Sequence, residues 1–152
     1  MNNDYAYELN YKFDIVELKH SLHWVLDDPD INRVDSLCLT HAPTKQEHPD
    51  DYYYQGAGSL YYEFKSAPGE VVKTKRESPL KEADFTHFID KIKHTYFYEV
   101  YKQLSVEFDI GRMRIMKIHP LHCLTWHGDT AKRIHIPIIS NPGNKLAIED
   151  SV

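Results

Sequence analysis

Residues 127–143 read HGDTAKRIHIPIISNPG and contain the pattern on which the fold assignment rests. Every second residue from 134 to 138 is isoleucine, and the residues between them are histidine and proline. Because successive side chains of a strand point to opposite faces, this alternation predicts a strand over residues 132–140 whose isoleucines pack on a core. The sequence Asn141-Pro142-Gly143 is typical of a turn and marks the end of that strand.

His127 and Asp129 stand two positions apart at the start of this stretch. In an extended segment, residues at this spacing point to the same side, so the imidazole and the carboxylate can converge on one point. These groups are two of the three ligands in the 2-His-1-carboxylate triad of non-haem Fe(II) oxygenases. A second His-x-Asp, His48-Pro49-Asp50, lies in a polar loop that offers nothing to hold a metal ion. The sequence therefore favours the first pair as a candidate iron site.

Arg133 and His135 share the face of the predicted strand that is opposite to the isoleucines. A guanidinium can bind a carboxylate through two parallel hydrogen bonds, and an imidazole can add a third contact. The two residues are therefore candidates for binding a carboxylate ligand. The alternative is that Arg133 pairs with an acidic residue of the protein and that His135 is an ordinary sheet histidine.

Upstream of this stretch, the sequence predicts two helices and several short strands. Asp14 can cap a helix whose apolar residues begin at Ile15, and Asp28-Pro29-Asp30 ends it. A longer helix is expected from residue 80 or 85 to about 107, and a hairpin or loop over 66–79. The expected strands are 33–40, 59–64, 112–119, 121–126, 132–140 and 144–149. This order is that of an α+β protein whose C-terminal half is a β-sandwich or barrel.

The composition is that of an ordinary soluble domain. The chain has 152 residues with a net charge of −5, which suits one domain and argues against a nucleic-acid or polybasic membrane surface. Cys38 and Cys123 do not form a disulfide framework, and the polar N-terminus lacks the features of a secretory signal. We therefore expect a cytoplasmic protein that binds neither nucleic acid nor membrane.

The C-terminal half resembles a known enzyme family. His127-x-Asp129, followed by the RIHIPIISNPG sequence of residues 133–143, is similar to the aspartyl/asparaginyl β-hydroxylase-like branch of the Fe(II)/2-oxoglutarate-dependent dioxygenases. The sequences GRMR of residues 111–114 and TYFYEVY of residues 95–101 are similar to members of that branch too. The resemblance covers roughly residues 84–150.

This resemblance implies a double-stranded β-helix, a jelly-roll architecture. Residues 1–152 would form a single dioxygenase-like domain, with helical and strand support in 1–110 and a partial double-stranded β-helix in 111–152. His127 and Asp129 would bind Fe(II), and Arg133 and His135 would contact 2-oxoglutarate. The implied reaction consumes O2 and 2-oxoglutarate, releases succinate and CO2, and hydroxylates a C–H bond of a polypeptide side chain (Asp, Asn or Pro) or of a small molecule.

The chain departs from this family after Asp129. The family's third iron ligand, a distal histidine usually followed by an arginine, has no counterpart here, and the last two strands of the β-helix are not expected. One interpretation is an oxygenase. The alternative is a truncated, non-catalytic β-helix that serves as a binding or assembly module, for which we expect self-association through open sheet edges.

Overall fold

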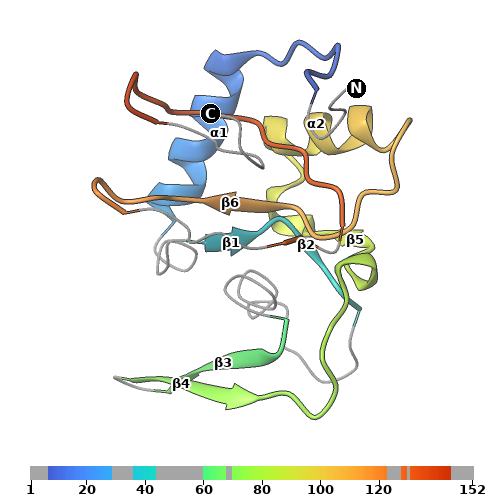
Figure 1. Cartoon of the computed structure of the whole chain (residues 1–152), viewed down its shortest axis with the longest axis vertical. Coiled ribbons are helices and arrows are strands. Elements are labelled where there is room, and N and C mark those ends of the chain that lie inside the picture. Colours follow the sequence, from blue (N-terminus) through green and yellow to red (C-terminus); the bar gives the residue numbers. More distant parts are fainter. Residues whose placement is uncertain are drawn as a thin grey trace.

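The computed structural model describes residues 7–28, 36–43, 60–67, 70–122, 128–129 and 131–144. Two helices, α1 (Ile15–Asp27) and α2 (Tyr96–Leu104), pack on each other and lie on one side of short strands in the middle of the molecule (Figure 1). The hairpin of β3 (Tyr62–Ala67) and β4 (Glu70–Lys75) lies at the opposite end. The described part of the chain is therefore a mixture of helices and antiparallel strands, as the α+β prediction requires.

The described strands form three separate two-stranded antiparallel sheets. In the first, β1 (Ser36–Cys38) pairs with β6 (Arg114–Met116), with Leu37 opposite Ile115. In the second, β2 (Thr40–His41) pairs with β5 (His87–Phe88), and the third is the β3–β4 hairpin. No closed barrel occurs among the described residues, so the double-stranded β-helix stays a prediction, as does the single domain over 1–152.

The helix predicted after Asp14 is confirmed at both ends. The Asp14 carboxylate Oδ1 accepts hydrogen bonds from the backbone N–H groups of Val16 at 2.8 Å and Glu17 at 3.2 Å. This contact satisfies amides that have no partner inside the helix. α1 ends at Asp27, directly before the predicted stop.

The larger of two hydrophobic clusters among the described residues joins α1 and α2 to β1, β5 and the residues that follow these strands. Segment 131–144 contributes to it from the side, because Ile136 and Ile138 pack against this cluster while Ile134 is exposed. The buried members of the core are Leu18, Leu22, Val25, Leu37, Leu39, Phe88, Ile89, Ile92, Phe97, Val100 and Leu104. Their burial is what holds the two helices to the central strands.

The long helix expected up to residue 107 is wrong in its first half. Only α2 is α-helical, and it is preceded by two 3₁₀ turns, Glu82–Asp84 and Asp90–Ile92, and by β5. The apolar residues of this segment have helical spacing, but the backbone N–H of Ile89 donates to the carbonyl of Leu39 at 2.9 Å. Pairing with the β2 segment therefore overrides the local periodicity.

Two of the predicted strands are observed with different bounds. The strand expected over 112–119 is reduced to β6, and the strand expected over 59–64 begins later, as β3. Of the strand expected over 33–40, β1 and the first residue of β2 are observed, and residues 33–35 lie outside the described residues. The predicted hairpin over 66–79 is confirmed by β3 and β4, although its turn residues Pro68 and Gly69 lie outside the described part.

Residues 132–140 form no strand within the described part of the chain. Pro137 lacks a backbone N–H, and the segment is held instead by the packing of Ile136 and Ile138. The turn that follows is confirmed, because the N–H of Asn144 donates to the carbonyl of Asn141 at 3.0 Å. Among residues 121–126, Leu121 has a φ of 63°, which is not strand geometry, and 123–126 lie outside the described residues, as do 145–149 of the last expected strand.

Neither helix of the described residues is long and apolar enough to cross a membrane.

Replacing Asp14 with alanine is expected to lower the free energy of unfolding by about 1 kcal/mol, because two amides lose their acceptor. Urea denaturation measures the change. Asp27→Ala is the matched control, since this exposed carboxylate sits in the last turn of the same helix, where the helix dipole does not favour it. Equal losses in the two variants would contradict the capping role.

Candidate functional site

The structure brings together two of the four residues predicted for the site. Asp129 and Arg133 form an ion pair, with the guanidinium Nη2 at 2.9 Å from the carboxylate Oδ1. His135 is exposed and makes no hydrogen bond or ion pair with the described residues. His127 lies outside the described residues, so the predicted iron pair His127 and Asp129 stays a prediction.

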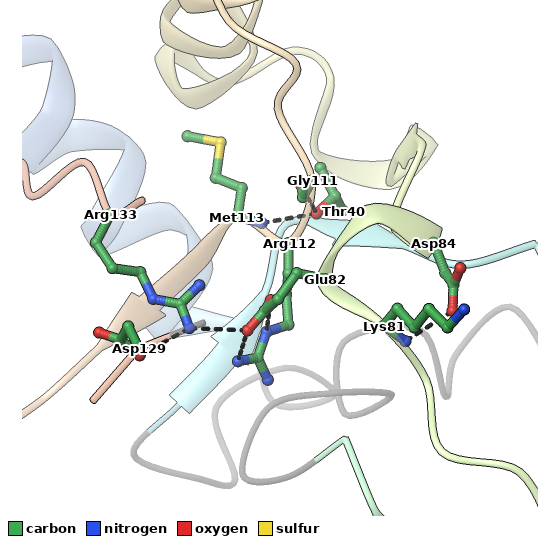
Figure 2. A network of polar contacts seen from close by, with 9 residues as sticks. All are labelled: Thr40, Lys81, Glu82, Asp84, Gly111, Arg112, Met113, Asp129 and Arg133. Atoms are coloured by element: carbon green, nitrogen blue, oxygen red, sulfur yellow. Dashed lines mark hydrogen bonds and ion pairs between the residues drawn. The ribbon is translucent and has the colours of Figure 1, made fainter. Parts of the chain in front are cut away.

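Arg133 also contacts a carboxylate that the sequence did not indicate. Its Nη2 donates to Oε1 of Glu82 at 2.9 Å, so one nitrogen serves both Glu82 and Asp129 (Figure 2). The sequence left open whether Arg133 pairs with an acidic residue, and it pairs with two. The contacts leave Nε and Nη1 without a hydrogen-bond partner among the described residues, and the side chain is 27% exposed. Arg133 therefore keeps donors that can reach a ligand.

Glu82 is held by a second arginine through both of its carboxylate oxygens. Nε of Arg112 donates to Oε2 and Nη2 donates to Oε1, each at 2.7 Å. The Arg112 side chain is 7% exposed and that of Glu82 is 17% exposed, so water screens this pair only weakly. A bidentate pair of this kind is both stronger and more directional than a single charged hydrogen bond.

The backbone reinforces the contact between Glu82 and Arg112. The N–H of Arg112 donates to the carbonyl of Glu82 at 3.1 Å. A Cβ added at Gly111 would lie 2.4 Å from the same carbonyl oxygen, so only glycine permits this approach.

Thr40 of β2 holds the same segment from the other side. Its hydroxyl donates to the carbonyl of Gly111 at 3.0 Å and accepts from the N–H of Met113 at 2.8 Å (Figure 2). Residues 111–113 are thus fixed between the Glu82–Asp84 turn and β2.

Three arginines, Arg112, Arg114 and Arg133, lie near Glu82. Arg114 lies opposite Cys38 in the β1–β6 pair, and burial together with the nearby charge of Arg112 lowers its pKa. Burial raises the pKa of the Cys38 thiol to about 12, against the opposing effect of the two guanidinium groups. Cys38 is therefore a thiol at neutral pH and not a nucleophile. The site offers positive charge, which suits an anionic ligand.

Burial by itself would raise the pKa of Glu82, but the net shift is downward. Hydrogen bonds from Arg112 and Arg133, together with their charges, outweigh burial and stabilise the carboxylate. Glu82 is therefore ionised at neutral pH and serves as the negative centre between two guanidinium groups.

Sequence reasoning missed Glu82 and the role of Arg112. Glu82 is 51 residues from Arg133 and 30 from Arg112, and it lies in a polar segment without periodicity. The one available signal was the GRMR sequence of residues 111–114, which marked Arg112 as part of the resemblance without giving it a partner.

No family model, no curated protein and no solved structure matches the chain. The resemblance to the oxygenases therefore stays a prediction. Within the part of the chain that the structure describes, no group of three or more His, Cys, Asp or Glu side chains could hold a metal ion.

Gly111→Ala is expected to lower the free energy of unfolding by about 1–3 kcal/mol, because the new methyl group would overlap the Glu82 carbonyl. Denaturation with urea gives the value. Gly128→Ala is the control, since a Cβ there would have no heavy atom within 4 Å. A Gly111→Ala protein as stable as the Gly128→Ala protein would show that this approach is not needed.

The low pKa of Glu82 predicts a specific dependence of stability on pH. Because the carboxyl has a lower pKa in the folded protein than in the unfolded chain, its contribution is complete well above about 4.3 and is lost as the pH falls further. Glu82→Gln should therefore reduce stability at neutral pH, and the difference from the original protein should narrow towards about pH 3.

The free energy of unfolding, measured at several pH values, tests this expectation. Glu77→Gln is the control, because Glu77 is exposed and has no ion pair with the described residues. A constant difference between the Glu82→Gln protein and the original across this pH range would contradict the assignment.

Proposed function

We propose that the chain is an Fe(II)- and 2-oxoglutarate-dependent oxygenase and that Arg133 binds a carboxylate of 2-oxoglutarate. The observation that supports this most is the way Arg133 is held. Two protein carboxylates engage a single nitrogen, Nη2, and among the described residues Nε and Nη1 have no hydrogen-bond acceptor and can donate to a ligand. An arginine that served only as an internal ion pair would be expected to use more of its donors on its protein partners.

Arg112 and Arg114 also favour a dianionic ligand near Arg133. The guanidinium groups of Arg112, Arg114 and Arg133 act on one another electrostatically. Among the described residues, the carboxylates that contact Arg133 are those of Glu82 and Asp129. Because the surroundings are partly buried, the attraction of the guanidinium groups for an anion is stronger than at a fully solvated surface. His135, two residues beyond Arg133 and exposed, is the second proposed contact for 2-oxoglutarate.

The residues that would hold Fe(II) are His127 and Asp129. The environment of Asp129 fits this role, because metal-binding carboxylates are themselves hydrogen-bonded and Oδ1 of Asp129 accepts from Arg133. When bound, iron would supply the activation of O2. Arg133 would orient 2-oxoglutarate, and Asp129 and Arg133 would neutralise each other when the ligands are absent.

The overall reaction balances as follows. A substrate C–H bond, O2 and 2-oxoglutarate give the C–OH product, succinate and CO2, with one oxygen atom in the alcohol and the other in succinate. The proposed substrate is a polypeptide side chain (Asp, Asn or Pro) or a small molecule.

A second candidate function is a non-catalytic binding or assembly module. The ion pair between Asp129 and Arg133 favours it, because this pair satisfies both side chains without a metal ion. Such a protein would form no succinate, and its thermal stability would not respond to chelators. The sheet edges that no described strand covers would then be available for self-association.

Anaerobic addition of Fe(II) and 2-oxoglutarate tests the proposed function. We expect the weak visible charge-transfer band of the iron–2-oxoglutarate complex, and we expect His127→Ala and Asp129→Ala to abolish it. His23→Ala is the matched control, since His23 is an exposed histidine of α1 outside the site. Absence of a band at millimolar 2-oxoglutarate would overturn the proposed function and favour the binding module.

A further inference from the structure

We propose that Glu82 is the positioning residue that holds the guanidinium of Arg133 for the carboxylate of 2-oxoglutarate. This inference rests on the proposed function. Glu82 comes from a 3₁₀ turn distant in sequence, and its Oε1 accepts from both Arg112 and Arg133 (Figure 2). Glu82 itself does not contact the ligand in this scheme and acts through Arg133.

Glu82 is the fixed member of its pair with Arg133. Both of its carboxylate oxygens are bound to Arg112, which is almost fully buried. Its carbonyl oxygen accepts from the N–H of Arg112 and lies against Gly111 without space for a methyl group. The turn is closed by Asp84, whose Oδ2 accepts from the N–H of Lys81 at 2.7 Å. Side chain and backbone therefore both hold Glu82 in place.

Arg133 is the adjustable member. Its side chain is more exposed than those of Glu82 and Arg112, and it belongs to segment 131–144, which forms no strand among the described residues. A long side chain of this type loses much conformational freedom when it binds a ligand. A guanidinium already ordered by Glu82 has lost that freedom beforehand, so it binds a carboxylate more tightly.

Asp129 cannot replace Glu82 in this role. Asp129 is 38% exposed against 17% for Glu82, so its attraction for Arg133 is more strongly screened. It is also the proposed iron ligand, and its carboxylate would then be shared with the metal. Of the two described carboxylates that contact Arg133, Glu82 is the one that is not a proposed iron ligand.

The test is the affinity of the protein for 2-oxoglutarate in the Glu82→Gln variant. A glutamine amide has no charge and only one acceptor oxygen, so its NH2 group must face a guanidinium donor of Arg112 or Arg133, and the hold on Arg133 is weakened. We expect the dissociation constant for 2-oxoglutarate to rise about tenfold, the effect of losing one charge-assisted hydrogen bond. The measurement is an anaerobic titration of the Fe(II)-loaded protein, followed by the charge-transfer band. The affinity for Fe(II) alone should stay unchanged.

Asp84→Asn is the matched control. It weakens the same 3₁₀ turn but removes no contact of Arg133, so the affinity for 2-oxoglutarate should stay that of the original protein. Should Glu82→Gln not fold, Glu82→Asp serves instead. Its shorter side chain keeps a charge beside Arg112 and withdraws from Arg133, so the same weakening is expected.

The outcomes separate the two proposals. If the original protein does not bind 2-oxoglutarate, the proposed function fails, and the positioning role of Glu82 fails with it. If it binds, and the Glu82 variant binds equally well or more tightly, the proposed function stands and the positioning role is overturned. The same conclusion follows if Asp84→Asn weakens binding as much as the Glu82 variant does, or if Glu82→Gln lowers the affinity for Fe(II) alone.

Discussion

The bidentate ion pair between Glu82 and Arg112 is the interaction on which the candidate site depends. It joins the Glu82–Asp84 turn to the segment that leads into β6, and both side chains are largely removed from water. Removal of one member would leave a charge with poor solvation, which is far more costly than the loss of an exposed ion pair. The close contact at Gly111 and the hydrogen bonds of Thr40 add constraints that do not depend on charge.

This pair organises what lies around it. Arg133 reaches it from segment 131–144, and Asp129 is then held by the same guanidinium nitrogen. A chain of alternating charges results, in which exposure increases from Arg112 through Glu82 and Arg133 to Asp129. Its buried end supplies rigidity, and its exposed end supplies donors and a carboxylate that a ligand or a metal ion could reach. This division is the one that a binding site needs.

The parts of the fold that could be predicted from sequence are those set by local chemistry. Asp14 and the Asp28-Pro29 stop defined α1, and Asn141-Pro142-Gly143 defined a turn, because a capping carboxylate and turn residues act on their nearest neighbours. The helical spacing of the apolar residues before α2 predicted a helix that does not form, because the backbone of Ile89 pairs with that of Leu39 instead. In the candidate site, Asp129 was predicted from its spacing to His127 and Arg133 from the alternation of a strand that the described residues do not form, and the ion pair between the two was not predicted. Glu82 could not be, because an ion pair between distant segments leaves no periodic signal.

The most direct measurement of the central claim is the heteronuclear NMR spectrum of the arginine Nε–H groups, recorded with and without 2-oxoglutarate. Zn²⁺ replaces iron so that the signals stay narrow, and Arg133→Lys assigns the signal of Arg133 by its disappearance. A ligand carboxylate bound at Arg133 predicts a shift of that signal, while the Nε–H of Arg112, already donated to Glu82, stays in place. An unchanged Arg133 signal at millimolar 2-oxoglutarate would contradict the account.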